Sequence, residues 1–324
     1  MNDTTYQVKS KGRKFVVNLL LFLLVAGLCF TILYPLLKLV PTVFSAIEDL
    51  GNPNVIWLPQ EFSTVAFKAA VRFVMPAGIW TLLKTVLFAA ALMVLQVFFS
   101  ALVGYSMARV KSVFSKIAYF LVILVFLTPR QSLLLAQYIF FKHFDFLGIM
   151  NIFTKAGETD LINNPVTLVL LAIFGFGVNQ SLFIFLFSQF FKNIPKELEE
   201  AANIDGCGFF RTYFRIMLPN AIPIISTVAV LSFVWNYGDT YFTNYFAPKF
   251  GLMSTLLSNT FVSANKSFIL NAIQTWFGIP AVNDFAFDAA KQAGVLIYLI
   301  PLIIVYLVGQ RKLVQNMENS GIVG

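Results

Sequence analysis

A polar insert, IPKELEEAANIDG at residues 194–206, interrupts a strongly apolar part of the chain, and IMLP follows at residues 216–219. Apolar runs lie on both sides of this insert. Because the hydrocarbon core of a bilayer is about 30 Å thick, a helix that crosses it needs about 20 mostly apolar residues. The insert therefore predicts a water-exposed loop between two membrane-spanning helices.

The composition of the whole chain supports this interpretation. Of its 324 residues, 58% are hydrophobic, 12% are charged and 37 are Phe, and the mean hydropathy is +0.79. These values are too apolar for a soluble domain. We therefore predict an all-α, polytopic membrane protein.

Six apolar runs have about the length of a membrane span. They are residues 15–37, 79–103, 117–136, 166–191, 221–235 and 293–308. The first follows a basic stretch, as in a secretory signal, but it is longer than a usual signal core and no small-x-small cleavage site follows it. We expect six transmembrane helices, with the first one retained.

The positions of Lys and Arg predict the orientation, because cytoplasmic loops carry an excess of positive charge. With the N-terminus inside, the cytoplasmic segments hold more than half of the 23 Lys and Arg residues. We therefore expect a multi-pass plasma membrane protein with a cytoplasmic N-terminus at 1–14, a transmembrane domain at 15–309 and a cytoplasmic tail at 310–324. Within the domain, the loop at 192–219 faces the cytoplasm and a long, aromatic-rich segment at 237–292 faces outward.

The polar insert has the features of a short helix that ends in a turn. Pro195 suits a first helical turn, where its missing N–H is not needed, and three glutamates at 197, 199 and 200 put negative charge near the positive end of the helix. Gly206 and Gly208 can end it, since glycine adopts positive φ without strain. Mostly small side chains form a stripe along one face of this helix, which could lie close against a partner surface. Its members are Leu198, Ala201, Ala202 and Asp205.

A second helix, at about residues 209–218, leads through Pro219 into the fifth apolar run. Together the two helices would form a rigid elbow able to transmit a push to the membrane spans. The alternative interpretation is an amphipathic helix that lies on the membrane without a partner, with Arg211 and Arg215 snorkelling.

The spacing E-A-A-x3-G-x9-I-x-L-P resembles the cytoplasmic coupling loop of the permease subunits of bacterial ABC importers. In that family a short helix of the loop docks into a cleft on the ATP-hydrolysing subunit. The resemblance implies a role in ATPase coupling for the matching residues. They are Glu200, Ala201, Ala202, Asp205, Gly206, Ile216, Leu218 and Pro219.

Other segments are similar to the carbohydrate-type permeases, particularly the maltose-type subunit with six spans. These segments are SALVGYSMAR at 100–109, the Trp235-Asn236 pair and the glycine-ended tail from residue 310. Two features depart from the family pattern: Lys84 stands where the family usually has Asn, and the tail lacks the lysine common before the last glycine. The resemblance implies the type I ABC importer permease fold.

The resemblance also implies partners and a function. The expected function is import of a sugar or oligosaccharide, with this chain as half of the translocation path. The implied partners are a second permease subunit in a heterodimer, two ATP-binding subunits and an extracytoplasmic solute-binding protein. No Walker-type G-x-x-x-x-G-K-[ST] occurs in the sequence, so we expect the partner subunits to use the ATP.

Residue usage argues against an enzyme. The single histidine, His143, lies in a predicted outer loop, and metal or triad sites need converging His, Cys or carboxylate groups. We therefore expect no catalytic residue, no metal site and no cofactor in this chain. The net charge of +8 comes from cations beside the spans, which indicates membrane lipid rather than nucleic acid as the partner.

Six residues are candidates for the substrate path. They are Lys84, Arg130, Asn179, Gln180, Trp235 and Asn236. Sugar sites combine an aromatic surface with amides, because a sugar ring has an apolar face and many hydroxyls. The alternative is that the amides only join neighbouring spans. Cations within spans usually snorkel or pair, so Lys84 and Arg130 either do so or line the path and select an acidic sugar such as a uronate oligosaccharide.

Two rival functions stay open at this stage. An ABC permease for a peptide, polyamine or phosphonate would share the coupling loop. An ion-driven secondary transporter would need carboxylates buried in its spans, and none of the six apolar runs contains Asp or Glu.

Overall fold

The computed structural model describes residues 2–52, 57–145, 159–279 and 282–321, with side chains between Lys14 and Gln310. Within these ranges the chain is helical and contains no strand beyond two isolated β-bridges, Ser45 with Phe62 and Phe144 with Thr159. The expected all-α fold is confirmed. The chain forms two compact units, one of residues 1–72 and 264–297 and the other of residues 73–263 and 298–324.

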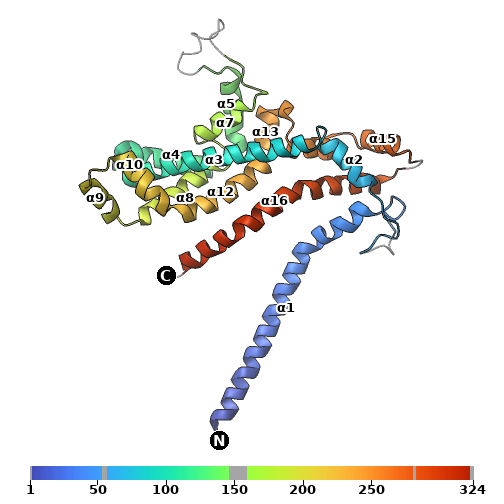
Figure 1. Cartoon of the computed structure of the whole chain (residues 1–324), viewed down its shortest axis with the longest axis horizontal. Helices are drawn as coiled ribbons and strands as arrows, with labels where there is room; N and C mark the ends of the chain where they lie inside the picture. Colours follow the sequence, from blue (N-terminus) through green and yellow to red (C-terminus); the bar gives the residue numbers. More distant parts are fainter. Residues whose placement is uncertain (1, 53–56, 146–158, 280–281, 322–324) are drawn as a thin grey trace. The chain divides into compact units, whose positions relative to one another are not determined.

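The first unit contains α1 (Asn2–Phe44), α2 (Val65–Val74), α15 (Lys266–Phe277) and the first part of α16 (Asp284–Gly321). The stretch Lys14–Phe44 of α1 is long and apolar enough to cross a membrane, and none of its most apolar window is buried (Figure 1). Because α1 is continuous from Asn2, the predicted boundary between residues 14 and 15 falls inside a helix.

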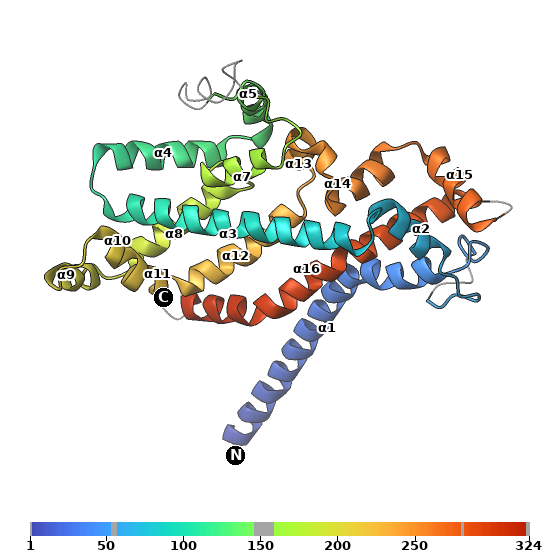
Figure 2. The same ribbon diagram turned by 45° about the horizontal axis from the view of Figure 1, so that its top comes forward.

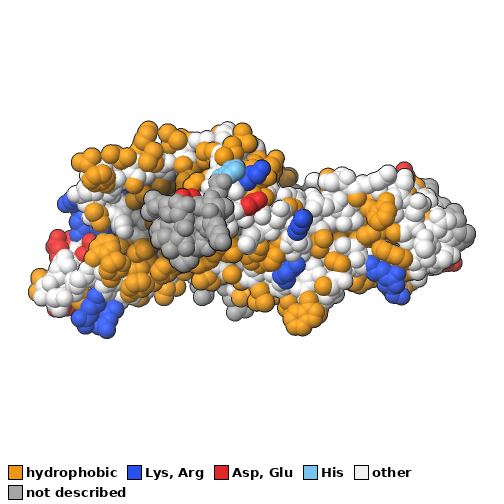
Figure 3. All heavy atoms as spheres, turned by 90° about the horizontal axis from the view of Figure 1, so that it is seen from above, with side chains coloured by type: hydrophobic (Ala, Val, Ile, Leu, Met, Phe, Trp, Pro, Cys, Tyr) orange, Lys and Arg blue, Asp and Glu red, His pale blue; other side chains and the backbone are white. Residues whose placement is uncertain are grey.

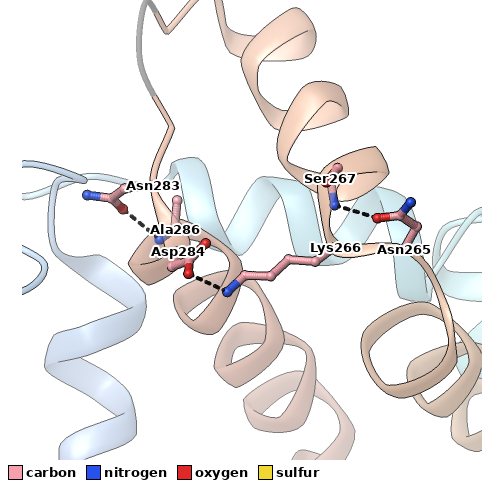
Figure 4. Close-up of polar contacts among 6 residues, drawn as sticks. All are labelled: Asn265, Lys266, Ser267, Asn283, Asp284 and Ala286. Atoms are coloured by element: carbon pink, nitrogen blue, oxygen red, sulfur yellow. Dashed lines mark hydrogen bonds and ion pairs between the residues drawn. The ribbon is translucent and has the colours of Figure 1, made fainter.

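Asparagine caps define where α15 and α16 begin. The Asn265 side chain accepts a hydrogen bond from the Ser267 N–H, and Asn283 does the same for Ala286 (Figure 4). The Lys266 ammonium lies 2.9 Å from the Asp284 carboxylate and joins the two helix starts.

Aromatic residues of the predicted outer segment pack on a cation in the same unit. The Arg72 guanidinium lies 5.2 Å from the ring centre of Trp276 and 5.3 Å from that of Phe277. These aromatic rings therefore have an internal role in holding α2 and α15 together.

The second unit is built around α3 (Ile79–Arg109), which packs against α8 (Gln180–Asn193) and α12 (Ile222–Tyr237) (Figure 2). Three shorter helices, α4 (Val113–Leu127), α5 (Arg130–Lys142) and α7 (Val166–Ile173), complete its bundle. The remaining elements are α9 (Glu197–Ile204), α10 (Phe209–Thr212), the π-helix η1 (Tyr213–Met217), α11 (Leu218–Asn220), α13 (Tyr241–Phe246), the 3-10 helix η2 (Pro248–Phe250), α14 (Met253–Ser258) and the π-helix η3 (Asn259–Ser263).

The predicted spans differ in their continuity. The described residues contain three single helices long and apolar enough to cross a membrane, Lys14–Phe44, Ile79–Arg109 and Asp284–Gln310, and up to five spans if each of two bent helix pairs is one. The third predicted run is such a pair, α4 and α5, bent by 110°. Thr128 is extended there because the following Pro129 disfavours helical geometry at the preceding residue and supplies no N–H.

The fourth predicted run is two helices rather than one, because residues 174–179 separate α7 from α8. Gly175 and Asn179 have positive φ angles of 86° and 53° in this break. The buried Gln180 side chain satisfies backbone groups that the break releases: it accepts from the Gly177 N–H at 2.9 Å and donates to the Ala172 carbonyl at 2.6 Å. A buried glutamine thus stabilises an interrupted helix.

Close contact between α3 and α8 depends on Gly104. A Cβ added there would lie 2.6 Å from Phe187 Cβ and 2.9 Å from the Ser188 backbone nitrogen. Small residues allow such close approach of helices in membranes. Buried polar groups join α3 to α12: Ser232 Oγ and Asn236 Nδ2 both donate to Gln96 Oε1, at 2.7 and 2.9 Å. The three helices therefore form one packed body.

We predict that Gly104→Ala lowers the free energy of unfolding by about 1–3 kcal/mol, the usual cost of overpacking, because the added methyl group meets the α8 backbone. The measurement is the thermal unfolding of the purified chain in detergent. The matched control is Gly27→Ala in α1, where an added Cβ has nothing within 4 Å. Equal melting temperatures for both variants would contradict the close contact.

Candidate functional site: an elbow and a pocket at two helix breaks

The polar insert forms the first part of an elbow, which we define as residues 197–220. Its first helix, α9, has Lys196 as its N-cap and therefore begins after Pro195. The sequence had instead predicted that Pro195 lies in the first helical turn. Three glutamates lie in its first turn, near the positive end of the helix, as predicted.

Gly206 ends α9 with a left-handed turn. Its φ is +75°, its N–H donates to the Asn203 carbonyl at 3.0 Å, and the next N–H, of Cys207, donates to the Ala202 carbonyl at 2.9 Å. This pair of bonds is the Schellman motif. An added Cβ at Gly206 would meet nothing within 4 Å, so the backbone conformation alone favours glycine there. Gly208 is different, because it is extended, with φ −76° and ψ 171°, and caps α10.

Arg109, the last residue of α3, holds the elbow in place. Its Nη2 donates to the Ile194 carbonyl at 2.6 Å, and its Nε lies 3.2 Å from Glu199 Oε1. The two side chains are only 7% and 18% exposed, so this ion pair is well shielded from water. Arg109 and Glu199 are not members of the predicted coupling set, although a cation that ends a long span and glutamates in the next cytoplasmic loop are a usable signal for such an ion pair.

An aromatic cluster supports the second part of the elbow. The ring of Tyr105 on α3 lies 5.0 Å from Phe209, 5.1 Å from Tyr213 and 5.4 Å from Phe191 on α8, measured between centres. Tyr213 and Phe191 are fully buried. Beyond this cluster the chain bends by 78° between Phe209–Asn220 and α12. The elbow is therefore packed against the ends of α3 and α8.

The exposed face of α9 differs from the predicted stripe. Ala202 is only 2% exposed and packs inward, so its assignment to an outward face was wrong, whereas Leu198, Ala201 and Asp205 are exposed. Ile204 adds an apolar side chain that is 86% exposed. Charged side chains of both signs gather at the end of the second unit where α9 and α10 lie (Figure 3).

The other residues of the predicted coupling set lie along the same elbow. Glu200, Gly206 and Pro219 are exposed, and Ile216 and Leu218 are half-buried. The structure thus brings the predicted set together and gives the elbow an outward face with both acidic and apolar groups.

A pocket of about 530 Å³ lies where the two helix breaks meet. The break between α4 and α5 contributes Thr128, Pro129 and Arg130, and the break between α7 and α8 contributes Gly177 and Asn179. Gln131, Gln137, Ser181, Tyr241 and Phe242 also line it. Interrupted helices form substrate sites in many transporters because their ends present backbone groups to a cavity.

Arg130 and Asn179 join the two sides of this pocket. Nη2 of Arg130 donates a hydrogen bond to Asn179 Oδ1. The helices α5 and α8 begin at this place, and neither has a side-chain cap on its first turn. Their positive ends and the guanidinium make the pocket electropositive.

Asp239 positions the aromatic wall of the pocket. Its carboxylate accepts hydrogen bonds from the N–H and hydroxyl of Thr243, at 2.8 and 2.9 Å, and so caps the helix that carries Tyr241. Burial raises the pKa of the Asp239 carboxyl above its ordinary value, although these hydrogen bonds and the charge of Arg130 act to lower it. Asp239 is absent from the residues predicted for the site, and Tyr241 belongs to the aromatic-rich segment predicted to face outward at 237–292.

The remaining path candidates do not line the pocket. Gln180 and Asn236 are buried in the hydrogen bonds described above, and the Trp235 ring stacks on Phe183 with centres 5.4 Å apart. The Lys84 ammonium donates to the Phe250 carbonyl and lies 4.9 Å from the centre of the Phe250 ring. The structure therefore does not place Lys84 beside Arg130, and the hypothesis of a joint anion-selecting pair is not supported for Lys84.

Comparison with known proteins identifies the family. Residues 98–319 match the model for the binding-protein-dependent transport system inner membrane component. A probable starch degradation products transport system permease protein, AmyC of Thermoanaerobacterium thermosulfurigenes, is 31% identical over 216 residues, which are 67% of this chain and 65% of that protein. The arabinooligosaccharides transport system permease protein AraQ of Halalkalibacterium halodurans is 25% identical over 95% of this chain and 98% of its own length.

This chain belongs to the family of binding-protein-dependent transport system inner membrane components, as the resemblance had implied. It is a multi-pass membrane protein. A solved bacterial ABC transporter involved in the import of the acidic polysaccharide alginate has a similar chain, with a TM-score of 0.67, 18% identity and coverage of 92% of this chain and 97% of that one. This likeness confirms the expected ABC importer permease fold.

We predict that Arg109→Met loosens α9, because it leaves the Glu199 carboxylate and the Ile194 carbonyl without their charged partner. A hydrogen bond to a charged group contributes about 1.5–3 kcal/mol, so amide exchange across residues 197–204 should become at least about tenfold faster. Hydrogen exchange with mass spectrometry measures this. Arg211→Met, an exposed cation on α10, is the control and should leave these amides unchanged. Equal protection in both variants would show that Arg109 does not hold the elbow.

Proposed function

We propose that this chain is the permease subunit of an ATP-driven importer of a sugar or oligosaccharide and forms half of its translocation path. The observation that carries the proposal is the complete coupling spacing on a packed elbow, in a chain of the binding-protein-dependent permease family. The sugar assignment is supported by the names of relatives, which include transporters of starch degradation products and arabinooligosaccharides.

The partners follow from this proposal. The sequence has no Walker-type phosphate-binding loop, so two separate ATP-binding subunits would hydrolyse the ATP. A second permease would complete the path as a heterodimer, and an extracytoplasmic binding protein would deliver the solute. Both termini and the elbow would face the cytoplasm, where the positive charge of the chain is concentrated.

The elbow would transmit force in three directions. A push on the exposed face of α9 would reach α3 through the Arg109–Glu199 ion pair and α12 through the bend after Asn220. It would reach α8 through the contact between the rings of Tyr213 and Phe191. Because these three helices are packed as one body, they would rock together, as alternating access requires.

The pocket at the two helix breaks would be the part of the path that this chain contributes. Arg130, Asn179 and the glutamines can exchange hydrogen bonds with sugar hydroxyls, and Tyr241 offers an aromatic surface for the apolar face of a ring. The electropositive lining argues against a polyamine, although it is compatible with a phosphonate or an acidic glycan. The names of the relatives favour a sugar over a peptide as the solute.

The coupling proposal predicts different effects for two nearby glycines. Gly206→Val forces a β-branched residue into positive φ and should lower uptake per ATP hydrolysed by about tenfold. Gly208→Val needs only extended backbone and should stay near the wild type. The assay is solute uptake with ATP hydrolysis in liposomes, using complexes that co-purify with an ATPase and a second permease. Unchanged coupling in an assembled Gly206→Val complex would refute the elbow mechanism.

The pocket proposal predicts that Arg130→Gln reduces uptake of the transported glycan by about tenfold, because a charged donor is lost from the path. The control is Lys84→Gln, a cation that lies against Phe250 and outside the pocket lining. Uptake is measured for a panel of neutral and uronate oligosaccharides. A loss confined to uronates would identify an acidic substrate, whereas no loss for any transported glycan would remove Arg130 from the path.

A further inference from the structure

A second cavity, separate from the helix-break pocket, lies at the turn between α3 and α4. Its volume is about 510 Å³. Polar and basic side chains contribute much of its lining. They are Lys111, Ser112, Ser115, Lys116, Tyr119 and Lys192.

The positive charge of this cavity is not compensated by the protein. In the described part of the chain, neither Lys111 nor Lys116 forms an ion pair, and no acidic residue lines the cavity. The Lys192 ammonium lies 4.2 Å from the centre of the Tyr119 ring, which leaves its charge in place. Three lysines therefore share one cavity without a counterion, an arrangement that costs Coulomb energy unless an anion binds.

The start of α4 adds to this positive potential. The first turn of α4 contains no acidic residue, and Ser112 Oγ accepts a hydrogen bond from the Ser115 N–H as its N-cap. Lys116 follows at the next position, near the positive end of the helix, where a cation is unfavourable by itself. The serine hydroxyls can still donate to an anion.

The location of the cavity is at the end of membrane-spanning helices. α3 is one of the candidate spans, and α4 begins a bent pair that is another. Next to the lysines, the apolar side chains of Val113, Phe114 and Ile117 are exposed, with Phe114 84% exposed. A basic cavity beside exposed apolar side chains matches an amphiphile with an anionic head and apolar tails.

We propose that this cavity binds the headgroup of an anionic phospholipid. Lys111, Lys116 and Lys192 would surround the phosphate, and the hydroxyls of Ser112 and Ser115 would donate to its oxygens. The acyl chains would lie against Phe114 and Ile117. Basic pockets at the ends of transmembrane helices bind anionic lipid headgroups by this combination of charge and position. The site does not depend on the transported solute or on the elbow.

The test is native mass spectrometry of the full-length chain, purified with its partner subunits, after addition of phosphatidylglycerol or phosphatidylcholine. We expect phosphatidylglycerol to bind in preference to phosphatidylcholine. Lys111→Gln combined with Lys116→Gln should weaken its binding by about tenfold or more, since each lysine near an anionic surface contributes about 1 kcal/mol. Lys111→Arg combined with Lys116→Arg keeps the charge and should retain it. Lys68→Gln combined with Lys249→Gln removes two exposed lysines elsewhere and is the control.

Three results would overturn the proposal. They are equal binding of the two lipids, unchanged phosphatidylglycerol binding by the Lys111→Gln and Lys116→Gln variant, or the same loss in the control variant. Excess inorganic phosphate distinguishes the source of the anion. Lipid retained in its presence supports a phospholipid site, whereas displacement by phosphate would assign the cavity to a free anion.

Discussion

Backbone N–H and C=O groups cannot be left unpaired in a bilayer, and this constraint determines where the chain can bend. The long helix α3 satisfies its own backbone over 31 residues and is the element on which α8 and α12 pack. Where a helix is interrupted, side chains supply the missing partners: Gln180 bonds both sides of the break between α7 and α8. Non-helical backbone at such depth is tolerated where it lines a cavity, and the pocket at Arg130 and Asn179 is such a place.

The elbow and the pocket are linked through the same packed helices. Arg109 ends α3 at the elbow, and Gln96, in the middle of α3, holds α12 through Ser232 and Asn236. α8 starts at the pocket and ends beside the elbow, and Gly104 allows it to lie directly against α3. A displacement at one end of this body therefore has a rigid route to the other end, which is what coupling of ATP hydrolysis to transport requires.

Electrostatics distinguishes the three places that we propose bind other molecules. The outward face of α9 is acidic and apolar, the pocket at the helix breaks is electropositive and rich in amides, and the cavity between α3 and α4 is lysine-lined. Each matches a different class of partner: a protein cleft, a hydroxyl-rich or anionic solute, and an anionic lipid headgroup. The first lysine of that cavity, Lys111, lies two residues after Arg109, so an anion bound there would steady the turn that follows the elbow's main contact.

The sequence by itself determined the helical class, the family and the position of the elbow. The length of an apolar run directly indicates whether it can cross a bilayer as a helix. The coupling spacing includes Gly206, whose positive φ few other residues tolerate. Only the tertiary structure decided which polar residues line a pocket and which serve as internal supports. Arg130 and Asn179 are 49 positions apart and form a hydrogen bond where the two helix breaks meet. Gln180 and Asn236 are equally polar, but their side chains form hydrogen bonds inside the helix bundle. The tertiary structure likewise decided that Ala202 is buried and that the Lys84 ammonium donates to the Phe250 carbonyl. Hydrophobic periodicity is a local property of the chain, but the facing of a side chain toward a cavity depends on contacts between distant helices.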